Sequence, residues 1–432
     1  MIVNTATLLE KFLSSTGVST DTRKIQAGNL FFALKGPNFN ANAMAKEALE
    51  KGAQYAIIDD ADYLAGERTL LVEDGLLALQ ALATAYRQTL TIPIVGLTGS
   101  NGKTTTKELI FSVLSQKYHC FATTGNLNNH IGVPLSVLSI KKEHEIAVIE
   151  MGANKQGDIK ELVDIAQPTH GLITNIGKAH LEGFGGIEGV RKGKGELFDF
   201  LKASGGITFL PQQASAVTEM YQERGMNKSV IVNEALPTTL VEAKPMVRYA
   251  LASGEIIDSH LPGIYNFENI QLAIAVGKFF QLSDEQCNRG IETYIPNNHR
   301  SQFIKIGSNQ VLMDAYNANP SSMSAAISHF AETEGTPKII ILGDMFELGD
   351  SSASEHAALG QLIAPLGFEK VLLVGSHMQH ALVHLPSAYY FPDKFGLHTW
   401  LQDHPITDSF LLVKGSRGIQ LESVLAFLEN SK

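Results

Sequence analysis

Short hydrophobic runs alternate with amphipathic stretches along the chain, a pattern that predicts strands alternating with helices. In the first part, the helix-like patterns AMAKEALEKGA and GLLALQALATAYRQ separate the strand-like runs NLFFALKG, AQYAIIDD and TLLVED. We therefore expect a small α/β domain over residues 1–88. Pro93 marks its exit, because proline disfavours helical backbone at the residue before it.

A second alternation begins at Ile94, with the strand-like runs IPIVGLTG, EIAVIEMGAN and HGLITNIGKAH and the helical pattern DIKELVDIA between the last two. It predicts a mostly parallel sheet in a central domain over residues 89–297. Ligands of such sheets bind beyond the carboxyl ends of the strands, so Gly99, Glu150 and His180 are expected to converge there. The weakly patterned stretch 205–260 predicts a peripheral sheet and loops.

The last part of the chain predicts a third domain, over residues 298–432. Three buried strand-like runs, KIIILGD, KVLLVGS and SFLLVKGSRG, each lead into a glycine turn, with helical segments such as SEHAALGQLIAPLG between them. This indicates a doubly wound, Rossmann-like domain. No GxGxxG follows its first strand, so a dinucleotide cofactor is not supported. The predicted fold class is therefore α/β with three domains.

Composition limits the partners and the location. The 432 residues exceed the size of one core, and 44% of them are hydrophobic. A net charge of -10 opposes nucleic-acid binding. Cys120 and Cys287 lack metal-ligand spacing, and the start MIVNTATLLEKFL lacks the pattern of a secretory signal. No run of about 18 apolar residues occurs. We expect a cytoplasmic, soluble protein that does not insert into membranes and is a monomer.

The stretch VGLTGSNGKTTTKE predicts a phosphate-binding loop between a strand and a helix. A strict pattern places glycine where this chain has Leu97, but small residues still let backbone N–H groups surround phosphate oxygens. Lys103 would meet the β and γ phosphates, and the Thr104 hydroxyl would bind magnesium. A glycine-rich turn with a solvated lysine is the alternative. The expected ATP-binding residues of the loop are Gly99, Ser100, Asn101, Gly102, Lys103, Thr104 and Thr105.

Several motifs, taken together and in order, resemble the Mur ligase family of ATP-dependent amide-forming enzymes. They are TGSNGKTTTKE, TGNLNNHIGVP, EMGAN, AHLEGFG, KGKGELF and GIYNFENIQLAIA. The shifted glycine pattern is typical of that family. Within the family, DTRKIQAGNLFFALKG, DAYNANPSS and ILGDMFELGDSSASEHAALG are typical of members that join D-alanyl-D-alanine to UDP-N-acetylmuramoyl-tripeptide in peptidoglycan synthesis. The resemblance implies that a carboxylate takes the γ-phosphoryl group and that an amine attacks the resulting acyl phosphate.

The expected catalytic residues are Lys103, Glu150, His180 and Lys194, and the expected magnesium ligands are Thr104, Glu150, His180 and Lys194. Glu150 ends an apolar strand, and its carboxylate suits this hard cation. For His180 the ligand role is implied by the resemblance; a packed or surface histidine is the alternative. The resemblance also implies a carbamate on Lys194, although Lys192 lies nearby and a solvated helix lysine is the other interpretation.

Further nucleotide contacts are implied for Asn266, Asn269, Arg300 and Asp314. Helix capping is a compatible interpretation of Asn266, and a surface salt bridge is the alternative for Arg300 and Asp314. If the third domain must move to deliver these residues, catalysis requires domain closure, which would exclude water.

Three groups of substrate contacts are also expected: two implied by the resemblance, with turn and capping roles as alternatives, and one placed in loops after strands of the third domain. They are Asp21, Thr22 and Arg23 for the uridine nucleotide; Thr124, Asn128 and Asn129 for the muramoyl part; and Asp344, Met345, Glu347, Leu348, Lys414, Ser416 and Arg417 for the dipeptide. Lys414 or Arg417 would pair with the dipeptide carboxylate.

Two rival functions stay open from the sequence. One is a related amide ligase that adds a single amino acid to a nucleotide-peptide, or glutamate to a folate; DAYNANP and GDMFELG argue against it. The other is a phosphate-loop switch that uses ATP only for conformational change. Such a switch has no need of Glu150, His180 and Lys194 around a second reaction centre.

Overall fold

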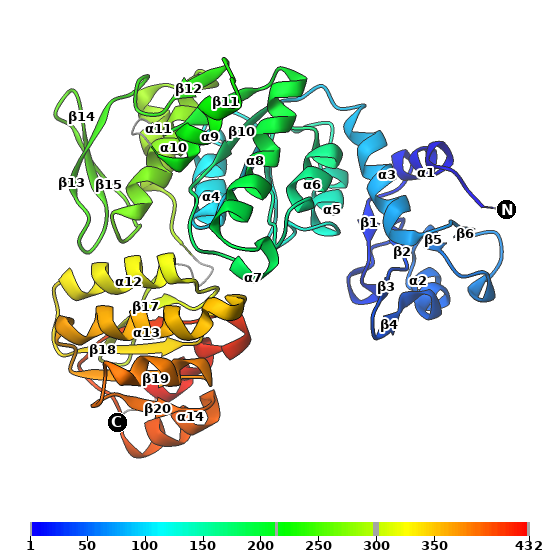
Figure 1. The fold of residues 1–432 in the computed structure, drawn as a ribbon. Helices are drawn as coiled ribbons and strands as arrows, with labels where there is room; N and C mark the ends of the chain where they lie inside the picture. The colour runs from blue at the N-terminus through cyan, green and yellow to red at the C-terminus, as the bar shows by residue number, and fades with distance from the viewer. Residues whose placement is uncertain (1, 212–214, 297–301, 430–432) are drawn as a thin grey trace.

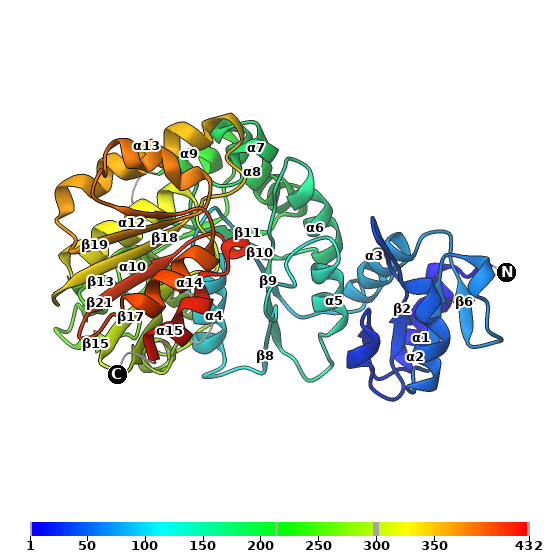
Figure 2. The ribbon, with the colours of Figure 1, turned by 90° about the horizontal axis from the view of Figure 1, so that it is seen from below.

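A computed structural model describes residues 2–211, 215–296 and 302–429 and has three α/β units (Figure 1). The N-terminal unit stands beside the central one and away from the C-terminal one in both views (Figures 1 and 2). The C-terminal unit lies directly against the central unit. The predicted α/β class is confirmed. No helix formed by the described residues has the length and apolar character that crossing a bilayer requires.

The N-terminal unit contains a four-stranded parallel sheet in the order β1-β2-β5-β6. Its strands are β1 (Val18–Ser19), β2 (Leu30–Phe32), β5 (Tyr55–Ile58) and β6 (Thr69–Leu71). The main helices are α1 (Thr5–Leu13), α2 (Ala45–Glu50) and α3 (Gly75–Arg87), and β3 (Lys35–Gly36) with β4 (Phe39–Asn40) forms a hairpin. Asp74 caps α3 by accepting a hydrogen bond from the Leu77 N–H at 2.8 Å. The last residue of α3 is Arg87, so the predicted border at residue 88 lies at the end of this helix.

The central unit contains a six-stranded parallel sheet in the order β12-β11-β10-β7-β9-β8. Its strands are β7 (Ile94–Thr98), β8 (Cys120–Ala122), β9 (Ile146–Glu150), β10 (His170–Ile173), β11 (Ile207–Leu210) and β12 (Ser229–Ile231). The helices are α4 (Lys103–Leu114), α5 (Gly132–Leu138), α6 (Asp158–Ala166), α7 (Leu181–Phe184), α8 (Ile187–Ser204), α9 (Ala216–Glu223), α10 (Tyr265–Phe279) and α11 (Asp284–Glu292). An antiparallel sheet of β13 (Thr238–Glu242), β14 (Arg248–Leu251) and β15 (Ile256–Asp258) lies beside it.

The expectation that 205–260 is only peripheral was partly wrong. The small sheet matches it, but β11 and β12 extend the central parallel sheet. Within the segment, β12 is weakly patterned because it lies at the sheet edge and none of its three residues is fully buried. An edge strand of this kind carries little hydrophobic signal.

Both faces of the central sheet are covered, which explains its continuous apolar runs. In β9, Ala147 and Ile149 join the cluster beneath α5, α6 and α8, while Ile146 and Val148 join the cluster beneath α4, α10 and α11. Successive strand residues point to opposite faces. The sheet is therefore the middle layer of three.

The C-terminal unit repeats this design with the strand order β16-β17-β21-β18-β19-β20. Its strands are β16 (Gln302–Ile306), β17 (Asn309–Asp314), β18 (Lys338–Gly343), β19 (Lys370–Val374), β20 (Tyr389–Phe391) and β21 (Phe410–Lys414). The helices are α12 (Pro320–Glu332), α13 (Ser352–Ile363), α14 (Lys394–Asp403) and α15 (Leu425–Glu429). Pairing is parallel except between β16 and β17. The predicted border at 297/298 lies outside the described residues.

A buried arginine joins the N-terminal unit to the central one. Arg87, 6% exposed, donates from Nε to the Ala166 carbonyl at 2.9 Å and from Nη2 to the Gln167 carbonyl at 3.0 Å. Its Nη1 donates to the Leu90 carbonyl at 2.8 Å. Burial lowers the pKa of the Arg87 guanidinium.

Replacing this arginine should weaken the union of the two units. Arg87→Met leaves three carbonyl groups without their donors, at a cost of about 2–4 kcal/mol. We expect a melting temperature lower by several degrees, measured by thermal unfolding. Arg68→Met, at an exposed arginine, is the control. Equal melting temperatures for the two variants would contradict the assignment.

Candidate active site

A cavity of about 670 Å³ lies between the central and C-terminal units. Residues 100–103, Glu150 and His180 line it from the central unit, and Asp314 and Lys414 line it from the C-terminal unit. Among the described residues that line it, none belongs to the N-terminal unit. The cavity lies beyond the carboxyl ends of β7 and β9, where ligands of parallel sheets bind.

The phosphate loop connects β7 to α4 through two glycines where backbone angles and close neighbours disfavour a side chain. Gly99 has φ of 151°, and an added Cβ would lie 1.9 Å from the Thr174 Oγ1. Gly102 has φ of 77°, and a Cβ there would meet the Asn269 Oδ1 at 2.8 Å. The Lys103 Nζ donates to the Gly99 carbonyl at 2.8 Å. The start of α4 thus borders the cavity, and the N-terminus of a helix is suited to binding anions.

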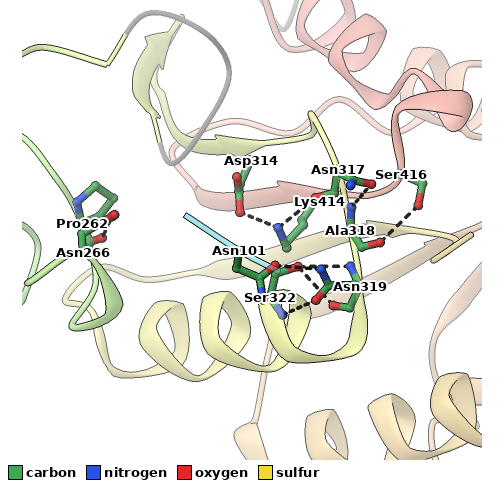
Figure 3. Close-up of polar contacts among 10 residues, drawn as sticks. All are labelled: Asn101, Pro262, Asn266, Asp314, Asn317, Ala318, Asn319, Ser322, Lys414 and Ser416. Atoms are coloured by element: carbon green, nitrogen blue, oxygen red, sulfur yellow. Dashed lines mark hydrogen bonds and ion pairs between the residues drawn. The ribbon is translucent and has the colours of Figure 1, made fainter. Parts of the chain in front are cut away.

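Asn101, at the centre of the loop, is held by residues from two units. Its N–H donates to the Asn175 Oδ1 at 3.0 Å, and its carbonyl accepts from the Thr174 hydroxyl at 2.5 Å. Its side-chain Oδ1 accepts from the Asn319 Nδ2 at 2.7 Å (Figure 3). Neither Asn175 nor Asn319 was among the residues expected at the site, although both lie in the motifs that predict it, HGLITNIGKAH and DAYNANPSS.

Glu150, the last residue of β9, is suited to hold a cation. It is 1% exposed, and its Oε1 accepts hydrogen bonds from the Thr104 hydroxyl at 3.1 Å and the Asn128 Nδ2 at 2.8 Å. Its Oε2 is buried without a hydrogen-bond partner in the described part of the chain. Such an oxygen costs free energy unless a ligand satisfies it. The pair Glu150 and Thr104 therefore fits Mg²⁺, which prefers oxygen ligands.

The other ligands of a Mg²⁺ ion would be groups other than Glu150 and Thr104. Within residues 2–211, 215–296 and 302–429, no group of three or more His, Cys, Asp or Glu side chains is placed to hold a metal. Magnesium sites commonly use one or two carboxylates together with substrate phosphates and water. The donor set around the phosphate loop matches that pattern.

Lys194 is a buried amine rather than a solvated lysine. It is 1% exposed, whereas the neighbouring Lys192 is exposed. Its Nζ lies 5.3 Å from the centre of the Phe184 ring and has no hydrogen-bond partner among the described residues. Burial, and secondarily the charge of Lys103, hold the pKa of the Lys194 amine well below its usual value. The alternative of a solvated helix lysine is wrong, because α8 turns Lys194 inward.

His180 reaches across to the C-terminal unit. Its Nδ1 contacts the Glu347 carboxylate, and this hydrogen bond lowers the pKa of Glu347. Both residues have left-handed backbone, with φ of 53° for His180 and 62° for Glu347. Non-glycine residues adopt it rarely, and such strain gathers at functional sites. Both side chains line the cavity.

Asn266 and Asn269 lie in the first turns of α10, close to the phosphate loop. The Asn269 Oδ1 accepts from the Thr106 hydroxyl at 3.0 Å, and its Nδ2 donates to the Asn266 Oδ1 at 2.9 Å. The interpretation of Asn266 as the helix cap is wrong, since α10 begins one residue earlier and Ile264 occupies the cap position. Instead, the Asn266 Nδ2 donates to the Pro262 carbonyl at 2.7 Å (Figure 3).

Asp314 and Lys414 form an ion pair at the end of neighbouring strands β17 and β21. The Lys414 Nζ lies 2.5 Å from the Asp314 Oδ2, and Lys414 is 1% exposed (Figure 3). Arg417 is exposed, lies 5.1 Å from the centre of the Tyr316 ring and also lines the cavity. Ser416 is buried and accepts a hydrogen bond from the Phe346 N–H at 3.0 Å. Of the two basic residues, Arg417 is the more accessible.

Besides Ser416, three of the residues expected to grip the dipeptide are buried and do not line the cavity. They are Asp344, Met345 and Leu348, which are 2%, 0% and 3% exposed. The Asp344 carboxylate accepts from the His377 and Met378 N–H groups at 3.2 and 2.9 Å. Met345 and Leu348 join the core beneath α13. In this structure the three residues support the loop that presents Glu347.

The expected uridine contacts lie in the N-terminal unit. Asp21 caps a short 3-10 helix, and the Arg23 side chain, bonded to it, holds the pKa of the Asp21 carboxyl well below its usual value. Thr22 is buried.

The residues expected to contact the muramoyl part lie in the central unit. Thr124 is exposed in the loop after β8, and the Asn129 Oδ1 accepts from the Gly132 N–H at 2.8 Å. Arg300 lies outside the described residues.

Together the parallel central sheet, the phosphate loop and the Rossmann-like third unit define a nucleotide-dependent enzyme of the phosphate-loop class. Three family descriptions match in order: "Mur ligase family, catalytic domain" at 14–87, "Mur ligase middle domain" at 97–277 and "Mur ligase, glutamate ligase domain" at 299–417. The UDP-N-acetylmuramoyl-tripeptide--D-alanyl-D-alanine ligase of Bacillus subtilis is 33% identical over 96% of this chain and 93% of its own length. The ligase of that name from Escherichia coli is 34% identical over 96% and 94%.

Solved structures agree with this assignment. A crystal structure of MurF from Acinetobacter baumannii superposes with a TM-score of 0.87, at 31% identity, over 98% of both chains. MurF ligase from Thermotoga maritima, in complex with ADP, has a TM-score of 0.82 at 25% identity, covering 97% of this chain and 98% of its own. The chain belongs to the Mur ligase family. It is an ATP-dependent ligase.

The buried carboxylate suggests a test in which stability and activity separate. Glu150→Gln keeps the shape of the side chain and removes a charge that, at one oxygen, has no hydrogen-bond partner among the described residues. We expect an unchanged or higher melting temperature, because burying a neutral amide costs less than burying a carboxylate. ATP-dependent turnover in Mg²⁺ should fall by about 100-fold or more. Glu143→Gln, on the surface, is the control; turnover by Glu150→Gln equal to that of the control would rule out the assignment.

Proposed function

We propose that this chain joins D-alanyl-D-alanine to UDP-N-acetylmuramoyl-tripeptide with ATP, forming ADP, phosphate and the UDP-linked pentapeptide used in peptidoglycan synthesis. The observation that carries the proposal is the single cavity lined by the phosphate loop, Glu150 and the C-terminal residues Asp314 and Arg417. The names of relatives that match over nearly their whole length support the choice of substrates.

The reaction proceeds in two steps. A carboxylate oxygen of the tripeptide attacks the γ-phosphorus of ATP, the bond to the bridging oxygen breaks, and ADP leaves. The dipeptide amine then attacks the carbonyl carbon of the acyl phosphate, loses a proton, and the C–O bond to phosphate breaks. Lys103 and the N–H groups at the start of α4 stabilise charge on the phosphates.

Thr104, Glu150 and a carbamylated Lys194 would hold Mg²⁺, which supplies charge neutralisation of the phosphates when bound. Carbamate formation joins the neutral amine nitrogen to the carbon of CO₂ and releases one proton. The burial of Lys194 favours it, because a neutral amine is the required nucleophile. His180 is proposed as a ligand that would have to leave Glu347.

Arg417 is the better candidate for the dipeptide carboxylate. Lys414 already forms an ion pair with Asp314 and also donates to the Asn317 carbonyl at 3.3 Å. The Arg417 guanidinium faces the cavity and has the planar geometry that matches a carboxylate. Asp314 is proposed for the ribose, and Asn266 and Asn269 for the base.

The remaining expectations belong to the same proposal. The N-terminal residues Asp21, Thr22 and Arg23 are proposed for the uridine nucleotide, and Thr124, Asn128 and Asn129 for the muramoyl part. Arg300 stays a prediction for the phosphates. A cytoplasmic location fits an enzyme that uses ATP and a UDP-linked precursor, and the monomeric state stays a prediction.

Coupled turnover is the direct test of the function. We expect phosphate release from ATP only when UDP-N-acetylmuramoyl-tripeptide and D-alanyl-D-alanine are both present, with the pentapeptide product detected by mass spectrometry. Release supported equally by single amino acids would indicate another amide ligase of the family. Release without either acceptor would indicate a phosphate-loop switch.

The proposed carbamate on Lys194 leads to a separate prediction. Lys194→Ala should lose most activity, because the second anionic group is missing, and added short-chain carboxylic acids should partly restore it. Lys192→Ala, at the exposed neighbour, should keep near wild-type activity. Phosphate release measures both. Full activity of Lys194→Ala without added acid would refute the carbamate.

A further inference from the structure

Asn319 occupies an unusual position, at the start of α12 and against the phosphate loop of another unit. It is 6% exposed, and its Oδ1 accepts a hydrogen bond from the Ser322 N–H at 2.9 Å. The Ser322 hydroxyl in turn accepts from the Asn319 N–H at 3.1 Å, which completes a capping box. This box fixes the orientation of the amide. The Nδ2 therefore points away from α12, toward Asn101 (Figure 3).

The Asn319 amide contacts the phosphate loop at Asn101. The Asn319 Nδ2 donates to the Asn101 Oδ1 at 2.7 Å. From the other side, Asn175 accepts from the Asn101 N–H at 3.0 Å and donates to its carbonyl at 3.1 Å. The backbone of Asn101 is thus held by its own unit, whereas its side chain is held by the C-terminal unit.

Ser321, two residues after Asn319, connects the two units at a second point. The Ser321 hydroxyl accepts from the Lys178 N–H at 3.2 Å. The Ser100 hydroxyl donates to the Gly177 carbonyl at 3.0 Å and accepts from the Gly177 N–H at 2.9 Å. The start of α12 therefore contacts the phosphate loop directly and also the loop that supports it.

We propose that Asn319 is a positioning residue that transmits docking of the C-terminal unit to the phosphate loop. It acts through Asn101, which directly precedes Gly102 and Lys103, the residues that shape and charge the phosphate site. Docking of α12 holds the Asn101 side chain, and the loop then keeps the geometry that binds phosphates. The inference rests on nucleotide binding at this loop under the proposed function, and it concerns no contact between Asn319 and the substrates.

Substitutions can remove the hydrogen bond from the Asn319 Nδ2 to Asn101 while keeping the capping role of the Asn319 side chain. Asn319→Ser keeps a good helix cap but is too short to reach Asn101, and Asn319→Asp keeps the cap while replacing the donor by an acceptor. Asn4→Ser is the matched control, because the Asn4 Oδ1 caps α1 by accepting from the Thr7 N–H at 3.0 Å, in the N-terminal unit.

ADP affinity, measured by calorimetry on the full chain, is the main readout, since it does not depend on the acceptors. We expect Asn319→Ser to raise the Kd for ADP about threefold to tenfold, the loss of one hydrogen bond. Asn319→Asp should raise it further, because its carboxylate faces the Asn101 oxygen. Asn4→Ser should leave it unchanged. The KM for the dipeptide should stay at its wild-type value while kcat falls.

A double-mutant cycle tests the route through Asn101. Asn101→Ser combined with Asn319→Ser should bind ADP no more weakly than Asn101→Ser alone. Additive losses would overturn the proposal, as would wild-type ADP affinity in both Asn319 variants. If the wild-type chain binds ADP but fails to couple the two acceptors, the proposed function is wrong and the role of Asn319 still stands.

Discussion

Parallel pairing in the central sheet is the constraint on which the site depends. Leu97 of β7 pairs with Glu150 of β9, and Thr98 pairs with Ile173 of β10. These strands therefore end together, and the residues that follow them meet at one edge. The phosphate loop, the buried carboxylate and the segment that holds Asn101 are neighbours for this reason alone. The residues of the C-terminal unit that line the cavity, such as Asp314 and Arg417, face this edge of the sheet.

The site contains groups that a core selected only for stability would avoid. Glu150 has a buried oxygen without a hydrogen-bond partner in the described part of the chain, and Lys194 has a buried amine in the same condition. Each costs free energy, since water has been removed and no described protein atom replaces its hydrogen bonds. Local departures of this kind concentrate at functional sites, where a ligand supplies the missing interaction. Here the two groups are suited to a cation and to CO₂.

The two junctions between units differ in character. The N-terminal and central units share a continuous hydrophobic cluster, to which Tyr86 and Ile140 both belong. The central and C-terminal units meet through polar contacts, including the ion pairs of Lys178 with Glu355 and Lys244 with Glu332, and through Leu181, which packs against the C-terminal core. Partly exposed polar contacts separate at low cost, whereas an apolar cluster does not. The polar junction borders the cavity and therefore suits movement of the C-terminal unit.

Much of this protein followed from the sequence by itself. The strands β7, β9 and β10 of the central sheet and β18, β19 and β21 of the C-terminal sheet were predictable, because their signals lie in contiguous apolar runs. The positions of the phosphate loop and of Glu150 at the ends of these strands were predictable from short motifs. The edge strand β12 was missed, since partial burial leaves little pattern, and the short buried strand β11 was missed with it. Only the tertiary structure decided that Lys194 rather than Lys192 is buried, that Lys414 is committed to Asp314, and that Asn319 contacts Asn101. Those outcomes depend on which distant segments exclude water from a side chain or supply its partner, and that information is absent from any local stretch of the chain.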